Sequence, residues 1–87
     1  MRSNENKEEY RMKELQVYFE GKDEVVDFVN RVSKYACEVD LRVGRFVVDA
    51  KSILGVLGIG TGKKAKMQVF TDNIDMIKKD LAPFIVA

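Results

Sequence analysis

The chain has no histidine, no tryptophan, one proline and one cysteine among its 87 residues. The lack of histidine excludes histidine bases, nucleophiles and metal ligands from this sequence. A single cysteine, Cys37, excludes an internal disulfide and a CxxC site, and we expect it to be a small buried apolar side chain. We therefore expect no metal site, no cofactor and no enzymatic activity.

Charged residues are plentiful, at 33% of the chain, but there is little excess of either sign. Fifteen basic and fourteen acidic residues leave a net charge of +1, which predicts no affinity for nucleic acid or for a membrane surface. The longest apolar-leaning run, residues 53–59, is far short of the roughly 20 residues that a membrane span needs. With so few cysteines, we expect a cytoplasmic protein.

The length predicts one domain. Residues 1–11 are mostly charged or amide side chains without an apolar period, so we expect a flexible N-terminal tail followed by a domain at 12–87.

Alternating apolar residues predict four strands. Leu15, Val17 and Phe19 form the first set, and residues 39–43 and 46–48 form a hairpin around Gly44 and Arg45. A fourth strand is predicted over 65–71.

Three helices separate or follow these strands. The first starts after a predicted Asp23 cap and has an apolar stripe of Val25, Phe28, Val29 and Val32. The second follows Ser52 over 53–59 and stops at Gly58 or Gly60, and the third follows Asp72 or Asn73. The order β-α-β-β-α-β-α predicts an α+β fold, an open-faced two-layer sandwich with a four-stranded antiparallel sheet and three helices on one face.

The short second helix carries more apolar residues than one buried stripe can hold. Five of its seven positions are apolar, so some of Ile53, Leu54 and Leu57 should lie in solvent. The alternatives are a deeply embedded helix, a homodimer contact, and a docking surface for a protein partner.

Ser52 is suited to capping this helix. Phosphorylation there would meet the free backbone N–H groups of the helix end and would add about two negative charges beside the apolar residues. Ser52 is therefore a candidate regulatory phosphorylation site.

Two other features have ordinary explanations. The glycines at 58, 60 and 62 match neither a Walker loop nor a dinucleotide loop, so they predict a turn between helix and strand. The carboxylates at Glu20–Asp27 suit an exposed helix face, although a small-molecule site there remains an alternative.

The segment Ala50-Lys51-Ser52-Ile53-Leu54-Gly55-Val56-Leu57, with Gly60 and Gly62-Lys63, resembles the regulatory-serine segment of HPr, the phosphocarrier of the bacterial sugar phosphotransferase system. The resemblance implies that Ser52 matches the serine that HPr kinase/phosphorylase modifies. It also implies that Ile53, Leu54 and Leu57 match the family's docking surface, bordered by Val26 and Asn30.

The resemblance also implies a departure at the phosphocarrier site. Counting back from Ser52 places Gly21 at the family's histidine, Asp23 at its arginine and Glu24 at its proline. We therefore expect a regulatory or docking module that carries no phosphohistidine. Its partner would be an HPr kinase-like enzyme or a transcriptional regulator, and the alternative is a weakly homodimerising structural domain.

Overall fold

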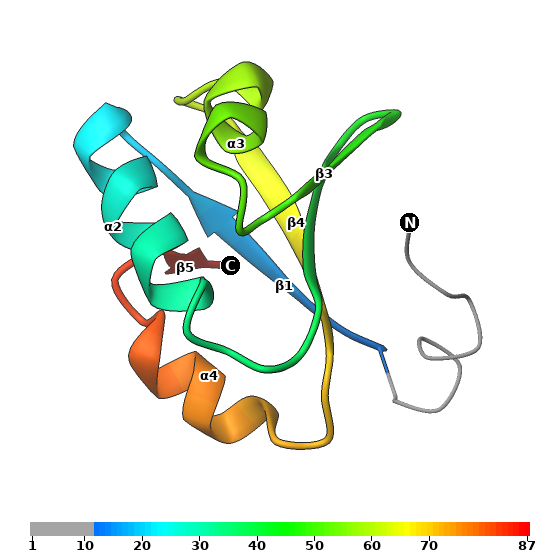
Figure 1. Ribbon diagram of the computed structural model, residues 1–87. Helices are drawn as coiled ribbons and strands as arrows, with labels where there is room; N and C mark the ends of the chain where they lie inside the picture. The colour runs from blue at the N-terminus through cyan, green and yellow to red at the C-terminus, as the bar shows by residue number, and fades with distance from the viewer. Residues whose placement is uncertain (1–11) are drawn as a thin grey trace.

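The computed structural model describes residues 12–87, so the predicted tail at 1–11 lies outside the described residues. Eight elements follow one another along this part of the chain (Figure 1). In order they are β1 (Met12–Tyr18), α2 (Lys22–Val32), β2 (Val39–Val43), β3 (Phe46–Asp49), α3 (Ile53–Ile59), β4 (Lys64–Phe70), α4 (Ile74–Asp80) and β5 (Ile85–Val86).

The strands form one antiparallel sheet in the order β3-β2-β4-β1-β5. The prediction of four strands is therefore wrong. The chain turns at residues 81–84, which include Pro83, and β5 then pairs with β1 at Gln16↔Val86 and Val17↔Ile85. The sequence did not indicate this strand because two residues are too few to set up a period of two.

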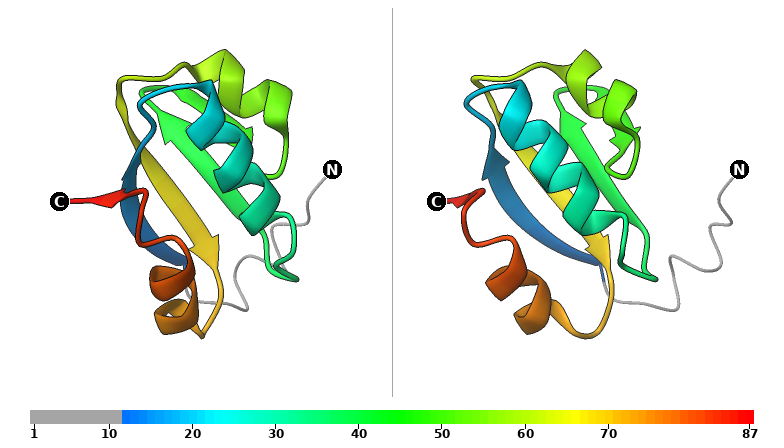
Figure 2. Two further views of the ribbon diagram at one scale, coloured as in Figure 1. Left: turned by 90° about the vertical axis from the view of Figure 1, so that its left-hand side faces the viewer. Right: turned by 60° about the vertical axis from the view of Figure 1, so that its left-hand side comes forward.

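The three predicted helices, α2, α3 and α4, lie on one face of the sheet and leave the other face open (Figure 2). Along α2 the predicted stripe is buried, as Val25, Phe28, Val29 and Val32 all face the core. The predicted Asp23 cap is wrong, because α2 begins earlier and its N-cap residue is Gly21. Glu24 instead accepts a hydrogen bond from the Glu20 backbone N–H at 3.1 Å, which fixes the entry of the chain into the helix.

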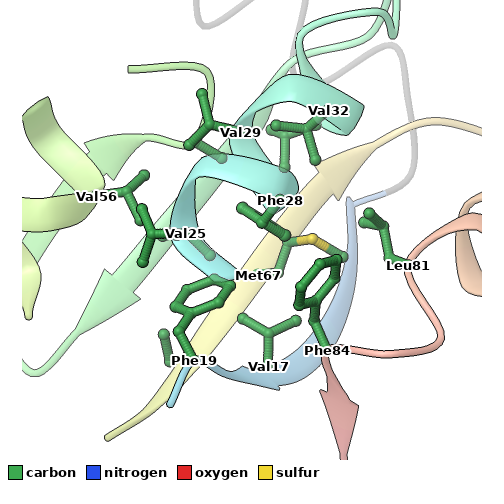
Figure 3. Close-up of a cluster of buried hydrophobic side chains, with 14 of the residues drawn as sticks. Val17, Phe19, Val25, Phe28, Val29, Val32, Val56, Met67, Leu81 and Phe84 are labelled. Atoms are coloured by element: carbon green, nitrogen blue, oxygen red, sulfur yellow. The ribbon is translucent and has the colours of Figure 1, made fainter. Parts of the chain in front are cut away.

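The centre of the core is aromatic. Phe28 of α2 lies 4.8 Å from Phe19 and 5.6 Å from Phe84, measured between ring centroids. Met67 of β4 and Leu81 pack beside these rings (Figure 3). Each aromatic side chain buries a large apolar area, so a few of them are enough to form the core of a small domain.

The β2–β3 hairpin is the one that the sequence predicts. Gly44 has a φ of +60° and is followed by Arg45, and a positive φ at only the first of two turn residues is typical of a type II′ turn. The pairing Leu41↔Val48 and Val43↔Phe46 places Phe46 and Val48 on the helix-covered side of the sheet.

Three smaller expectations can also be checked. The predicted stop of α3 at a glycine is confirmed, because Gly60, with a φ of +101°, is the C-cap residue. Asn73 is the N-cap residue of α4, as one of the two predicted positions, but its side chain makes no capping hydrogen bond. Ile77, Leu81 and Phe84 are buried as predicted. Cys37 is a free cysteine but only half-buried, so the expectation of full burial is wrong.

A polar cluster joins α2 to α4. Arg31 donates from Nη1 to the Asp80 backbone carbonyl at 2.6 Å and from Nε to Asp27 at 2.9 Å. Tyr35 donates its hydroxyl to the Asp80 carboxylate. Burial raises the pKa of Tyr35, and the hydrogen bond to Asp80 raises it further.

The raised pKa of Tyr35 predicts a loss of stability at alkaline pH. The stabilisation is present below the unfolded tyrosine pKa of about 10 and is lost as the pH rises above it, because the unfolded chain then releases the phenolic proton first. The unfolding free energy of the wild type should therefore fall more steeply above pH 10 than that of Tyr35→Phe, in urea titrations at a series of pH values. Equal slopes would contradict this role for Tyr35.

Candidate functional site

The first candidate position is the start of α2. Gly21 is the N-cap residue, with an extended backbone (φ −155°, ψ −176°) that any residue can adopt. A Cβ atom built at Gly21 would meet no atom within 4 Å. A side chain would therefore fit here and would lie over the N-terminus of an 11-residue helix.

The side chains that follow Gly21 are unfavourable for an anion. Asp23 and Glu24 both lie in the first turn of α2. Two carboxylates complement the helix dipole, which stabilises the helix, but they repel an approaching phosphoryl group. Residues 20–24 line an open depression of about 520 Å³.

Two of the four carboxylates between Glu20 and Asp27 have structural partners. Glu24 accepts the Glu20 N–H, and Asp27 forms an ion pair with Arg31 at 2.9 Å. Asp27 is exposed, as expected for a carboxylate on the outer face of the helix. The small-molecule alternative at Glu20–Asp27 stays a prediction.

Ser52 is the N-cap residue of α3, as predicted. Its hydroxyl oxygen accepts a hydrogen bond from the Gly55 backbone N–H at 3.1 Å, and the residue is exposed. The first turn of α3 contains no acidic residue, so no neighbouring carboxylate on that turn opposes a negative charge at Ser52.

The prediction that α3 exposes apolar side chains is confirmed. Leu54 is 80% exposed and Ile53 is 38% exposed, whereas Leu57 is half-buried against the core. Val56 alone is fully buried and lies beside Val25 of α2 (Figure 3). Successive helix residues are about 100° apart, so Leu54 lies on the side of α3 opposite buried Val56. Ile53 and Leu57 lie to one side of Leu54.

The residues expected from α2 are also accessible. Val26 is 39% exposed and Asn30 is exposed, and α2 and α3 pack against each other. These residues, Val26, Asn30, Ile53, Leu54 and Leu57, are called the α2–α3 surface below.

Sequence reasoning missed a second accessible apolar group. Phe46 is 68% exposed and Val47 is 48% exposed, both on the hairpin next to α3. The run of β-type residues that contains them predicted a strand. Nothing in that run indicates that β3 lies at an edge of the described sheet, where its side chains are more accessible.

Two features do not occur in residues 12–87: a cluster of metal ligands and a membrane-spanning helix. No group of three or more acidic or cysteine side chains comes together there to hold a metal ion. Nor does any helix of that range have the length and apolar character for crossing a membrane.

Part of the sequence is similar to a known protein family. Residues 24–79 match the family model described as the PTS HPr component phosphorylation site. No curated protein matches the sequence significantly. The matched range contains Ser52 and the whole α2–α3 surface, and it begins three residues after Gly21.

The cap at Ser52 predicts a measurable effect on stability. Ser52→Ala removes the hydrogen bond to Gly55 and should lower the unfolding free energy by about 1 kcal/mol. Ser52→Asp should retain most of it, because aspartate caps as well as serine and its charge favours the helix end. Urea denaturation measures both; equal losses in the two variants would contradict the cap.

Proposed function

Since the chain belongs to the HPr family, we propose that it is a regulatory, protein-docking member that carries no phosphohistidine. The observation that carries this proposal is the combination of no histidine in the sequence with exposed Leu54 beside a capping serine. A phosphocarrier needs a nucleophile, and the N-cap residue of α2 is Gly21, which has none.

The environment of Gly21 supports the same conclusion. Where the family resemblance places an arginine and a proline, this chain has Asp23 and Glu24. An arginine would attract the phosphoryl group, whereas two carboxylates in the first helical turn repel it.

The proposed regulation acts at Ser52. A kinase of the HPr kinase type would direct the Ser52 hydroxyl oxygen at the γ-phosphorus of ATP; the new O–P bond forms, ADP leaves, and the kinase takes the hydroxyl proton. The hydroxyl is exposed and its helix has no acidic residue in the first turn, so the phosphate could accept hydrogen bonds from the backbone N–H groups there.

The proposed docking uses the α2–α3 surface. Leu54 would be the central anchor, with Ile53 and Val26 around it and Asn30 supplying a polar contact. A phosphate at Ser52 would place negative charge next to Ile53, so a partner with a basic rim would bind more tightly and one with an acidic rim less tightly.

The lost carrier function can be tested by attempted restoration. With enzyme I of the phosphotransferase system and labelled phosphoenolpyruvate, the wild type should take up no acid-labile label. The triple variant Gly21→His, Asp23→Arg, Glu24→Pro should gain it, because the new side chain at position 21 has space and the repelling carboxylates are removed. Label on the wild type would contradict the proposal.

The control for restoration is the single variant Gly21→His. It keeps Asp23 and Glu24 and should be labelled at least about tenfold more slowly than the triple variant, since two like charges still oppose the phosphoryl group.

Docking and regulation can be tested with purified partners. Two-dimensional NMR titration with an HPr kinase and with an HPr-responsive transcriptional regulator should shift the signals of residues 52–57. Leu54→Asp should abolish the shifts, and Ser52→Ala should abolish incorporation of labelled phosphate from ATP. Shifts located on α4 instead, with Leu54→Asp binding normally, would exclude the α2–α3 surface.

A further inference from the structure

A groove lies between α3 and the β2–β3 hairpin, on the opposite side of Leu54 from Ile53 and Leu57. It has a volume of about 710 Å³ and apolar walls. Its lining includes Arg45 and Phe46 of the hairpin, Leu54, Gly55 and Gly58 of α3, and Lys63. The helix geometry explains why these residues of α3 line the groove. Around the helix, going away from Ile53, the order is Leu54, Gly58, Gly55 and Ile59.

Two glycines shape the groove. At Gly55 an added Cβ would lie 3.3 Å from the Val48 Cβ, so this glycine allows α3 to sit close against β3. At Gly58 an added Cβ would meet nothing within 4 Å. The helix is therefore in contact with the hairpin at one glycine and leaves open space one turn later.

Large apolar side chains border this open space. Phe46 on the hairpin and Leu54 on the helix are the two most exposed large hydrophobic residues among those described, at 68% and 80%. Exposed apolar walls around an open groove favour an occupant with its own bulky apolar side chain.

The charges at the groove have one sign. Arg45 and Lys63 are the only ionisable residues in its lining, and both are cations. Lys51 and Lys64 are not in the lining, and they donate to the backbone carbonyls of Tyr35 and Ala87. The groove thus combines apolar walls with a positive rim.

We propose that this groove binds a segment of a partner protein that carries a bulky apolar anchor flanked by carboxylates. The anchor would lie between Phe46 and Leu54 over Gly58, and the carboxylates would pair with Arg45 and Lys63. This site adds a second surface to the docking role proposed above and shares only Leu54 with the α2–α3 surface.

The test uses defined peptides and the full chain. The probe is acetyl-Glu-Asp-Leu-Phe-Glu-Asp-amide, and two controls replace its acids by lysine or its Leu-Phe pair by Ser-Ser. In two-dimensional NMR titrations the probe should shift the amide signals of Phe46, Gly55 and Gly58, and both control peptides should bind at least about tenfold more weakly.

Two variants locate the site. Gly58→Leu fills the open space and should abolish binding, while thermal unfolding should show an unchanged or higher midpoint because leucine is a better helix former than glycine. Arg45→Glu should weaken binding by about fivefold or more and should reduce its dependence on salt. Val26→Asp, on the α2–α3 surface, should leave peptide binding unchanged.

Three results would overturn the proposal: undiminished binding to Gly58→Leu, equal binding of the lysine peptide, or concentration-dependent shifts at Phe46 without peptide, which would make a second copy the occupant. The two docking proposals separate cleanly. Val26→Asp should weaken binding of the partners tested on the α2–α3 surface and should leave peptide binding unchanged. Gly58→Leu should abolish peptide binding and should leave binding of those partners unchanged.

Discussion

The docking surface that we propose depends on how little of α3 reaches the core. The helix has seven residues, five of them apolar, and only Val56 is fully buried. A two-layer sandwich has one core, and its centre is already occupied by Phe19, Phe28 and Phe84 between α2 and the sheet. Leu57 and Ile59 are therefore only partly buried against this core, and Leu54, on the side of α3 away from it, stays 80% exposed. Keeping such residues exposed costs solubility, which is why they indicate an interaction surface.

Much of this arrangement follows from the sequence. Three helices, the hairpin at Gly44 and the Ser52 cap were predicted because each has a local signal: a period of 3.6, an alternation broken by glycine, or a hydroxyl before an apolar run. A count predicted that some of Ile53, Leu54 and Leu57 are exposed, since seven helical residues cannot bury five apolar side chains on one stripe. The count did not single out Leu54.

What could not be predicted depends on contacts between distant segments. Strand β5 consists of two residues and exists because β1 offers it an edge, as the Tyr18 N–H bond to the Phe84 carbonyl also indicates. The cluster of Arg31, Tyr35 and Asp80 joins residues 45 to 49 positions apart. The groove beside Gly58 requires knowing that α3 crosses next to the hairpin, which no local pattern contains. The Asp23 cap was wrong for a local reason, because the extended backbone that precedes α2 lies at position 21, and the helix therefore begins earlier.

The two proposed surfaces of α3 are coupled through charge. A phosphate on Ser52 would sit at one end of a helix that is only about 10 Å long, so the part of the groove that α3 lines would lie within roughly one Debye length of it. The groove attracts carboxylates because Arg45 and Lys63 line it, and about two added negative charges would reduce that attraction. The same phosphate would favour a partner with a basic rim on the α2–α3 surface. One modification could thus exchange an acidic partner for a basic one, with Leu54 serving both, and the fold would need no rearrangement because the serine already caps the helix.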